Sequence, residues 1–242
     1  MKKLILSLIF TAAAFTAFAF QATVVSTKGK TEVQNGTTWV TLKEGDSLDQ
    51  GSVIQTGFKS ELVLKIKEST VTVSPLSRIT LKTLAEREGI NGEAGKDETT
   101  IFLDTGSLKS NVQKSADRRV GFTVKSPVAT ASVRGTEFGF ASRYKRAKLS
   151  TTRGSVAFWK AKNNKEAEGT EDAPVNAVMV SQGEVSNSTA AGVSKPSETA
   201  KESAVSLGSG TQTASSQEAG TETSSTSGGS KEATILVELI FE

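Results

Sequence analysis

The residues best suited to bind an anion form one short cluster, Arg143, Tyr144, Lys145, Arg146 and Lys148, interrupted only by an alanine. Cations grouped around an aromatic ring could contact an anionic polymer or lipid headgroups. Such a run is more often a solvated hairpin loop, and we expect an exposed loop here. The first residues of the cluster, with Ser142, also match the Ser-x-x-Lys motif of penicillin-binding enzymes. We reject that match because neither a helix opening at the serine nor a Lys-Thr-Gly strand accompanies it.

Arg134 is the second candidate for anion binding, because a guanidinium group forks onto a carboxylate or a phosphate. The alternative is a structural role, in which Arg134 satisfies backbone carbonyls at a bend after Val133 or pairs with a carboxylate inside the fold. We favour the structural role. Replacing Arg134 by alanine is then expected to leave acceptors unpaired, at a cost of about 1–3 kcal/mol.

The composition excludes several kinds of chemistry. The chain has no cysteine and no histidine, which removes thiolate and imidazole catalysis, disulfides and the usual zinc and copper sites. Glu44, Asp46 and Asp49 could offer oxygens to calcium, but their spacing does not fit a calcium loop, so we interpret them as an acidic turn. No pair of carboxylates stands out as an acid and base couple. We therefore predict no catalytic, cofactor-binding or metal-binding residue, no cofactor and no enzyme activity.

The formal charge is +3, and two of the cations, Lys2 and Lys3, begin an apolar leader. Without them the chain is nearly neutral, so no nucleic-acid partner is indicated. The apolar run ends in Ala17-Phe18-Ala19, the small-x-small pattern of a secretory cleavage site. An uncleaved membrane anchor is the alternative, but the run is shorter than the roughly 20 apolar residues of a span. We expect an exported, periplasmic protein without a stable membrane span after cleavage.

The candidate residues around Arg134 lie in a stretch, residues 124–140, whose apolar pattern changes register. Ala129, Ala131 and Val133 alternate with polar residues, and the next apolar positions are Phe138 and Phe140, one residue out of step. A slip of one residue turns a strand's apolar side chains to its other face. This pattern predicts two strands with a bend at Gly135, where the missing Cβ permits positive φ.

The rest of the chain up to Gly183 predicts short strands separated by turns. We expect an opening pair at 22–26 and 31–34, a tight turn at Asn35-Gly36, and later strands. These later strands are expected at 39–42, 52–56, 61–66, 70–73, 78–81, 100–103, 107–112, 120–125, 147–151, 156–159 and 175–181. Two charged insertions, 83–98 and 160–172, are expected as exposed excursions. Gly51, Gly106, Gly154 and Gly183 share a similar context, which suggests one glycine turn used repeatedly.

The domain organisation expected from these patterns has four parts. Residues 1–19 are the signal peptide and residues 20–185 a single β domain. Residues 186–230 are rich in Ser, Thr, Gly, Ala and Glu and predict a disordered linker, because such a segment buries too little apolar surface to offset its ordering entropy. Residues 231–242 are apolar and β-prone. We expect this terminal strand to dock marginally on an edge of the domain or to extend a partner's sheet.

The stretch Val133, Arg134, Gly135, Thr136, Glu137 and Phe138 resembles the Val-Arg-Gly-Thr-x-Phe hallmark of FecR-like domains of bacterial cell envelopes. The resemblance extends over roughly residues 23–181 and includes Gly45-Asp46 and Thr56-Gly57. Where the family usually has an Asp-Gly-Ser turn, this chain has Lys67-Glu68-Ser69. The resemblance implies a mainly β fold, a β-sandwich or wound β-roll of short antiparallel strands.

The resemblance also implies a non-catalytic binding module with a role in envelope sensing or assembly. Its expected partner is an envelope protein or an anionic envelope polymer. The sigma-binding segment and transmembrane helix of the FecR regulators are not recognised in this chain, so signal relay across the inner membrane is not expected. The alternative is an envelope hydrolase acting on glycan or peptide through carboxylates that the sequence does not single out.

The cleavage pattern predicts that the mature protein begins at Phe20. The intact mass of the protein recovered from an exported fraction tests this prediction. A mass that still includes residues 1–19 would contradict cleavage and favour the membrane-anchor alternative.

Overall fold

Alternation of inward apolar and outward polar residues produces strands, and no helix, in the part of the chain that the structure describes. The computed structural model describes residues 18–89, 92–161, 173–189 and 191–198. The strands are β1 (Phe18–Ala19), β2 (Ala22–Lys28), β3 (Thr31–Asn35), β4 (Thr38–Thr41), β5 (Ser47–Leu48), β6 (Val53–Thr56), β7 (Glu61–Ile66), β8 (Ser69–Val73), β9 (Arg78–Arg87), β10 (Lys96–Asn111), β11 (Arg119–Lys125), β12 (Ala129–Val133), β13 (Glu137–Arg143), β14 (Arg146–Arg153), β15 (Ser155–Lys160), β16 (Val178–Ser181), β17 (Glu184–Thr189), β18 (Gly192–Val193) and β19 (Ser197–Glu198).

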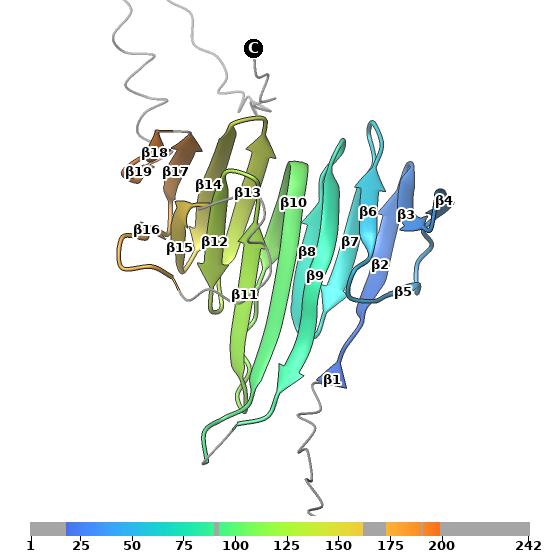
Figure 1. Ribbon diagram of the computed structural model, residues 1–242, viewed down its shortest axis with the longest axis horizontal. Helices are drawn as coiled ribbons and strands as arrows, with labels where there is room; N and C mark the ends of the chain where they lie inside the picture. Colours follow the sequence, from blue (N-terminus) through green and yellow to red (C-terminus); the bar gives the residue numbers. More distant parts are fainter. Residues whose placement is uncertain (1–17, 90–91, 162–172, 190, 199–242) are drawn as a thin grey trace, which may run out of the picture.

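These strands build two sheets that share the long strand β10 (Figure 1). Sheet A has the order β4-β3-β6-β9-β10-β11-β12-β15-β16, with β1 beside the far end of β9. Sheet B has the order β5-β2-β7-β8-β10-β13-β14-β17, with β18 and β19 beside β17. Among these pairings β10–β11 is parallel and the others are antiparallel. The mainly β fold is therefore confirmed.

The chain passes repeatedly from one sheet to the other, and most crossings contain a residue with positive φ. The glycines at these crossings are Gly29, Gly45, Gly51, Gly106, Gly135, Gly154 and Gly183. Glycine adopts positive φ without the steric cost that a Cβ imposes. Lys59 and Leu76 take the same conformation at two further crossings, with φ of 53° and 54°. The repeated glycine turn expected from the sequence is the device by which the chain changes sheet.

The core lies between the two sheets and is closed by aromatic pairs. Phe122 of sheet A meets Phe138 of sheet B edge to face, with ring centroids 6.4 Å apart. Phe140 and Phe158 make the same kind of contact at 6.1 Å. Edge-to-face pairs at these separations add to the stabilisation from burial. The sheets are thus packed directly face to face.

The bend at Gly135 is confirmed, and the two sheets explain it. Strand β12 lies in sheet A and β13 lies in sheet B, and Gly135 between them has a φ of 84°. Val133 before the bend and Phe138 after it are both buried. A chain that enters the opposite sheet must turn its other face to the same core, so the apolar register slips by one residue.

Two expectations about the first part of the chain have different outcomes. The expected opening pair is wrong, because β2 belongs to sheet B and β3 to sheet A. The cause is the crossing at Gly29, where φ is 71° and a Cβ would lie 2.5 Å from Ser60 Oγ. The hairpin at Lys67, where the chain departs from the family pattern, does form between β7 and β8. Lys67 itself carries the positive φ of that turn, at 53°.

The charged stretch 83–98, expected as an exposed excursion between strands, instead supplies the paired outer parts of β9 and β10. Lys96 pairs with Arg87 across these two strands, and β11 pairs alongside in parallel. We call residues 84–89, 92–99 and 118–121 the charged arm. It lies at the lower end of the sheets in Figure 1. Apolar alternation is missing there because ion pairs take its place.

Several of these ion pairs are short. Arg118 Nε lies 2.6 Å from Asp97 Oδ1, and Arg87 Nε lies 2.9 Å from Glu98 Oε2. The hydrogen bond from Lys67 is the main cause that lowers the pKa of Glu86, and the hydrogen bond to Asp97 is the main cause that raises the pKa of Arg118. The stabilisation from Glu86 is complete above the ordinary pKa of a glutamate and is lost as the pH falls through its lowered pKa.

The β domain continues past residue 185, where the linker was expected to begin. Strand β17 runs to Thr189, with Ser186 and Ser188 buried. Ser186 Oγ donates to the Ser194 carbonyl at 2.8 Å, so a small hydroxyl residue replaces an apolar one on the inner face. This is why a composition rich in serine did not indicate a strand. The rest of the expected linker from residue 199, the terminal segment 231–242, residues 1–17 of the leader and residues 162–172 lie outside the described residues.

Two crossing glycines with positive φ differ in the space around them, and this difference gives a test. At Gly106, φ is 98° and a Cβ would lie 2.5 Å from the Ser77 Cα, whereas at Gly183, φ is 79° and nothing lies within 4 Å. Gly183→Ala is expected to cost about 1–2 kcal/mol from backbone strain alone. Gly106→Ala adds a backbone clash and should cost clearly more, on the order of 3 kcal/mol. Denaturant unfolding of both variants measures the difference, and equal costs would contradict the close approach at Gly106.

Candidate interaction surface

The bend motif is held by Thr136 through both its side chain and its backbone. The Thr136 hydroxyl donates to the Ser155 carbonyl at 3.1 Å, and the Thr136 carbonyl accepts from the Val112 N–H at 2.9 Å. Thr136 itself is buried. A Cβ on the neighbouring Gly154 would lie 3.3 Å from the Gly135 carbonyl oxygen. Thr136 therefore joins the end of β10, the β12–β13 bend and the β14–β15 crossing.

The Arg134 side chain does not lie where it could satisfy backbone carbonyls at the bend. Its side chain is exposed, and it forms no ion pair or side-chain hydrogen bond with a residue that the structure describes. The stem of Lys114 lies over Gly135, where a Cβ would be 2.4 Å from Lys114 Cγ. The structural role of the motif remains a prediction, and the hydrogen bonds that would carry it belong to Thr136 and not to the Arg134 guanidinium.

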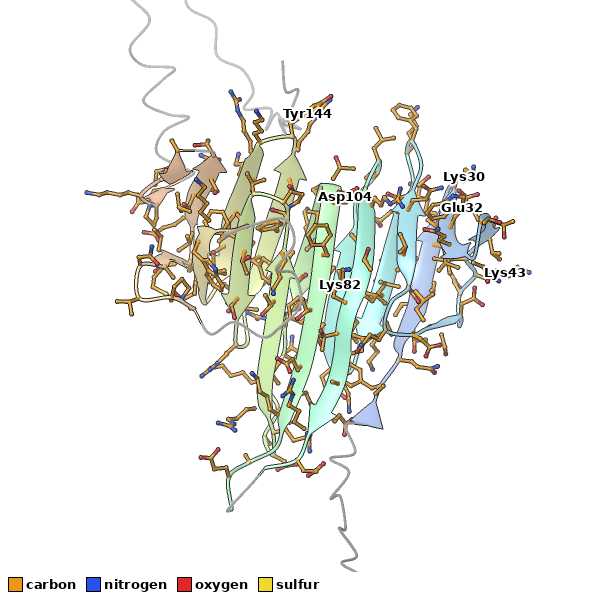
Figure 2. The ribbon with its side chains drawn as sticks, viewed as in Figure 1. Lys30, Glu32, Lys43, Lys82, Asp104 and Tyr144 are labelled. Atoms are coloured by element: carbon orange, nitrogen blue, oxygen red, sulfur yellow. The ribbon has the colours of Figure 1, made fainter. Side chains whose placement is uncertain are left out.

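The basic cluster forms the tip of the β13–β14 hairpin, where Arg143 pairs with Arg146. Tyr144 is 87% exposed and has a φ of 52°, and the Arg143 guanidinium lies 5.9 Å from the centroid of its ring. Arg143, Lys145 and Arg146 are exposed and Lys148 is half-buried. None of these cations forms an ion pair with a described carboxylate. Figure 2 shows Tyr144 projecting from the upper end of the molecule.

The structure does not bring the two candidates together. Arg134 precedes the first residue of β13, and the basic cluster begins at the last residue of that strand. Arg134 and Tyr144 therefore lie at opposite ends of β13. A single anion site built from both is excluded by this geometry.

The hairpin instead belongs to a row of linked turns, and the sequence patterns did not indicate that these turns lie together. The Gly57 N–H donates to the Lys30 carbonyl at 2.8 Å, and the Leu76 N–H donates to the Gly57 carbonyl at 3.2 Å. Next along, the Ser107 N–H donates to Ser77 Oγ at 3.0 Å, and Gly106 pairs with Ser142. We call this row the turn rim; it comprises residues 28–30, 57–60, 74–77, 104–107 and 142–146.

Two exposed apolar residues in the turn rim could have been noticed in the sequence. Phe58 lies between Gly57 and Lys59, and Leu76 follows Pro75, so each large apolar side chain lies in a turn. Phe58 is 73% exposed and Leu76 is 61% exposed. Large apolar residues are uncommon in solvated turns, so their presence in a turn can be recognised in the sequence separately from the alternation that marks strands.

Two of the acidic residues considered for calcium, Asp46 and Asp49, accept hydrogen bonds from the protein. The Lys43 N–H donates to Asp46 Oδ2 at 2.8 Å, and the Gln21 side-chain amide donates to Asp49 Oδ1 at 2.8 Å. Within the described ranges, no group of three or more acidic residues is arranged to hold a metal ion. The same ranges contain no helical segment with the length and apolar character needed to cross a bilayer.

Comparison with known proteins bears on the family resemblance. Residues 52–157 match the family model described as FecR protein. The resemblance is confirmed for this part of the chain. The matched FecR-like region includes the bend motif, the shared strand β10 and the basic hairpin. A comparison with curated proteins finds no match.

Two solved structures show a more distant likeness. Both are crystal structures of a protein from Parabacteroides distasonis ATCC 8503 that is named as a candidate anti-sigma factor, at 2.50 Å and 1.65 Å resolution. Each has 14% sequence identity and a TM-score of 0.43. The matches cover 64% of this chain, and they span 63% and 64% of the other two chains.

The geometry of the bend predicts that Thr136 contributes more to stability than Arg134. Thr136→Val keeps the shape of the side chain but removes a buried hydrogen bond, so we expect a loss of about 1–3 kcal/mol. Arg134→Ala is the matched control and should change stability by no more than about 0.5 kcal/mol. Thermal and denaturant unfolding of both variants test this. A larger loss for Arg134→Ala would restore the hydrogen-bonding role of the guanidinium.

Proposed function

We propose that this protein is an exported, non-catalytic binding module of the cell envelope that acts in envelope sensing or assembly. The observation that carries the proposal is the FecR match over residues 52–157. The apolar leader with its Ala17-Phe18-Ala19 pattern supports export. A rigid double sheet that presents rows of turns at its ends is a scaffold suited to binding, because the turns are held by strands on both sides.

The positions of the buried carboxylates favour binding over hydrolysis. Glu98 is buried in the charged arm, yet Arg87 and Lys96 approach its two oxygens at 2.9 Å and 3.7 Å. Asp97 lies beside Arg118. An acid and base couple needs carboxylates that converge on a substrate with pKa values pushed apart. These carboxylates are instead paired with nearby cations of the charged arm, which suits a structural role for this arm.

The proposed partner is an envelope component, a protein or an anionic polymer. A sigma factor is not proposed, because the likeness to the two solved structures is too distant to transfer what their name implies. Sensing in the envelope would need an exposed surface, such as the turn rim.

The proposal is tested by fractionating bacteria that express the full chain and by assaying the purified protein. We expect a processed protein in the exported fraction that releases no product from purified cell-wall glycan or peptide. In the same cells, a photo-crosslinking residue at Tyr144 should capture an envelope component, and one at Lys43, an exposed position outside the turn rim, serves as the matched control.

Two results would overturn the proposal. Turnover of a cell-wall substrate that disappears when one carboxylate is replaced by its amide would establish the hydrolase alternative. Retention of unprocessed protein in the cytoplasm would refute an envelope role.

A further inference from the structure

The turn rim gathers three large apolar side chains that are far apart in the sequence. Phe58, Leu76 and Tyr144 lie on separate turns and are 73%, 61% and 87% exposed. They come together because the sheet crossings bring their turns to the same end of the sandwich, the upper end in Figure 1. Among the described residues, the exposed aromatic and leucine side chains are these three, whereas the other large exposed apolar residues are three valines and a methionine: Val25, Val40, Val175 and Met179. Exposed aromatic and leucine side chains at one end of a protein suit contact with an apolar medium.

The backbone holds these tips in place. Lys59, Leu76 and Tyr144 all adopt positive φ, at 53°, 54° and 52°. Leu and Tyr adopt this conformation only rarely, which marks the turns as positions where surrounding hydrogen bonds impose the backbone shape. The hydrogen bonds from Gly57 to Lys30 and from Leu76 to Gly57 link neighbouring turns. The tips therefore project from one connected surface.

The charge around the tips is uncompensated. Lys28, Lys59, Arg143, Lys145 and Arg146 are exposed, and none of them pairs with a described carboxylate. The Lys59 ammonium lies 5.5 Å from the centroid of the Phe58 ring, so a cation accompanies the apolar tip. The exposed acids in or beside the rim are Asp104 and Glu61, and Lys30 pairs with Glu32. The rim is therefore net positive.

The opposite end of the molecule has the reverse character. In the charged arm, Arg87, Lys96, Arg118 and Arg119 all pair with carboxylates of the same arm. Surface charge that served only solubility would not need to be paired at one end of the molecule and unpaired at the other. This asymmetry gives the molecule one end suited to an anionic partner.

We infer that the turn rim docks on an anionic lipid membrane surface, with Phe58, Leu76 and Tyr144 at the boundary between headgroups and acyl chains and the cations on lipid phosphates. Separate apolar tips with cations between them suit a fluid surface that adapts to each tip. A protein partner would favour one contiguous apolar patch. This inference rests on the proposed export, which would place the rim beside an envelope membrane.

Flotation of the purified full chain with vesicles tests the inference independently of export. Vesicles of phosphatidylcholine mixed with phosphatidylglycerol should carry the protein, and vesicles of phosphatidylcholine alone should not. The triple variant Phe58→Ser, Leu76→Asn and Tyr144→Asn should lose at least about tenfold in apparent affinity. Asn tolerates positive φ, so this variant should fold. The matched control replaces exposed apolar residues elsewhere, Val25→Ser, Val40→Ser and Met179→Ser, and should float as the parent chain does.

The charge contribution is tested by Lys59→Gln with Lys145→Gln, which should weaken binding about fivefold for each cation removed. Lys43→Gln with Lys82→Gln is the control, because Figure 2 places both lysines away from the upper end. Added salt should weaken binding of the parent chain more than binding of the Lys59→Gln, Lys145→Gln variant, because that variant has fewer cations to screen.

The depth of contact is measured with a polarity-sensitive dye, which a single cysteine can carry because the chain has none of its own. A dye at Tyr144→Cys should shift towards an apolar environment on anionic vesicles, and a dye at Lys43→Cys should not. No flotation with anionic vesicles would overturn the inference. So would equal losses in rim and control variants, or binding that depends on the cations but not on the apolar tips, which would indicate a soluble polyanion as the ligand.

Discussion

Strand β10 belongs to both sheets and joins them into one folding unit. The first part of β10 pairs with β9 and β11 in sheet A, and its last part, from Gly106, pairs with β8 and β13 in sheet B. The change of sheet occurs at Gly106, where any Cβ would meet the backbone of Ser77. Ser77 Oγ accepts from the Ser107 N–H at 3.0 Å and lies 3.1 Å from the Ser107 carbonyl oxygen. The rest of the fold is built outward from this crossing on both sides.

The same constraint decides where exposed residues collect. Because each crossing returns the chain to the opposite sheet, turns from distant parts of the sequence meet at the ends of the sandwich. One end contains the cations and the exposed apolar side chains of the turn rim, including Tyr144. The other end receives the charged arm, whose cations are neutralised by acids such as Asp97 and Glu98. The difference between the two ends is a consequence of topology and is not visible in overall charge.

Local patterns were sufficient to predict the class of fold, the bend at Gly135 and the repeated glycine turn. Each of these depends on neighbouring residues, because register and positive φ are local properties. Sheet membership was not predictable in the same way. Residues 100–103 and 107–112 suggested two strands where the chain forms one, since Gly106 gives the same signal in a turn and in a crossing.

The candidate site was predictable only in part. The exposed basic hairpin follows from its composition, but its place at the same end of the sheets as Phe58 and Leu76 depends on pairings across the whole domain. The charged arm was missed because ion pairs such as Arg87 with Glu98 replace apolar alternation, the signal that identifies strands. Arg134 shows a further limit, since a motif match does not reveal which of its residues makes the hydrogen bonds.

Native-state amide hydrogen exchange across β10 tests most directly whether the two sheets form one body. Amides around Ile101, in the sheet A part, and around Leu108, in the sheet B part, should exchange with the same opening free energy, equal to that of global unfolding. Gly106→Ala should lower both values by the same amount. If one part of β10 opened at a clearly lower free energy than the other, the sheets would be separate units and the account would be contradicted.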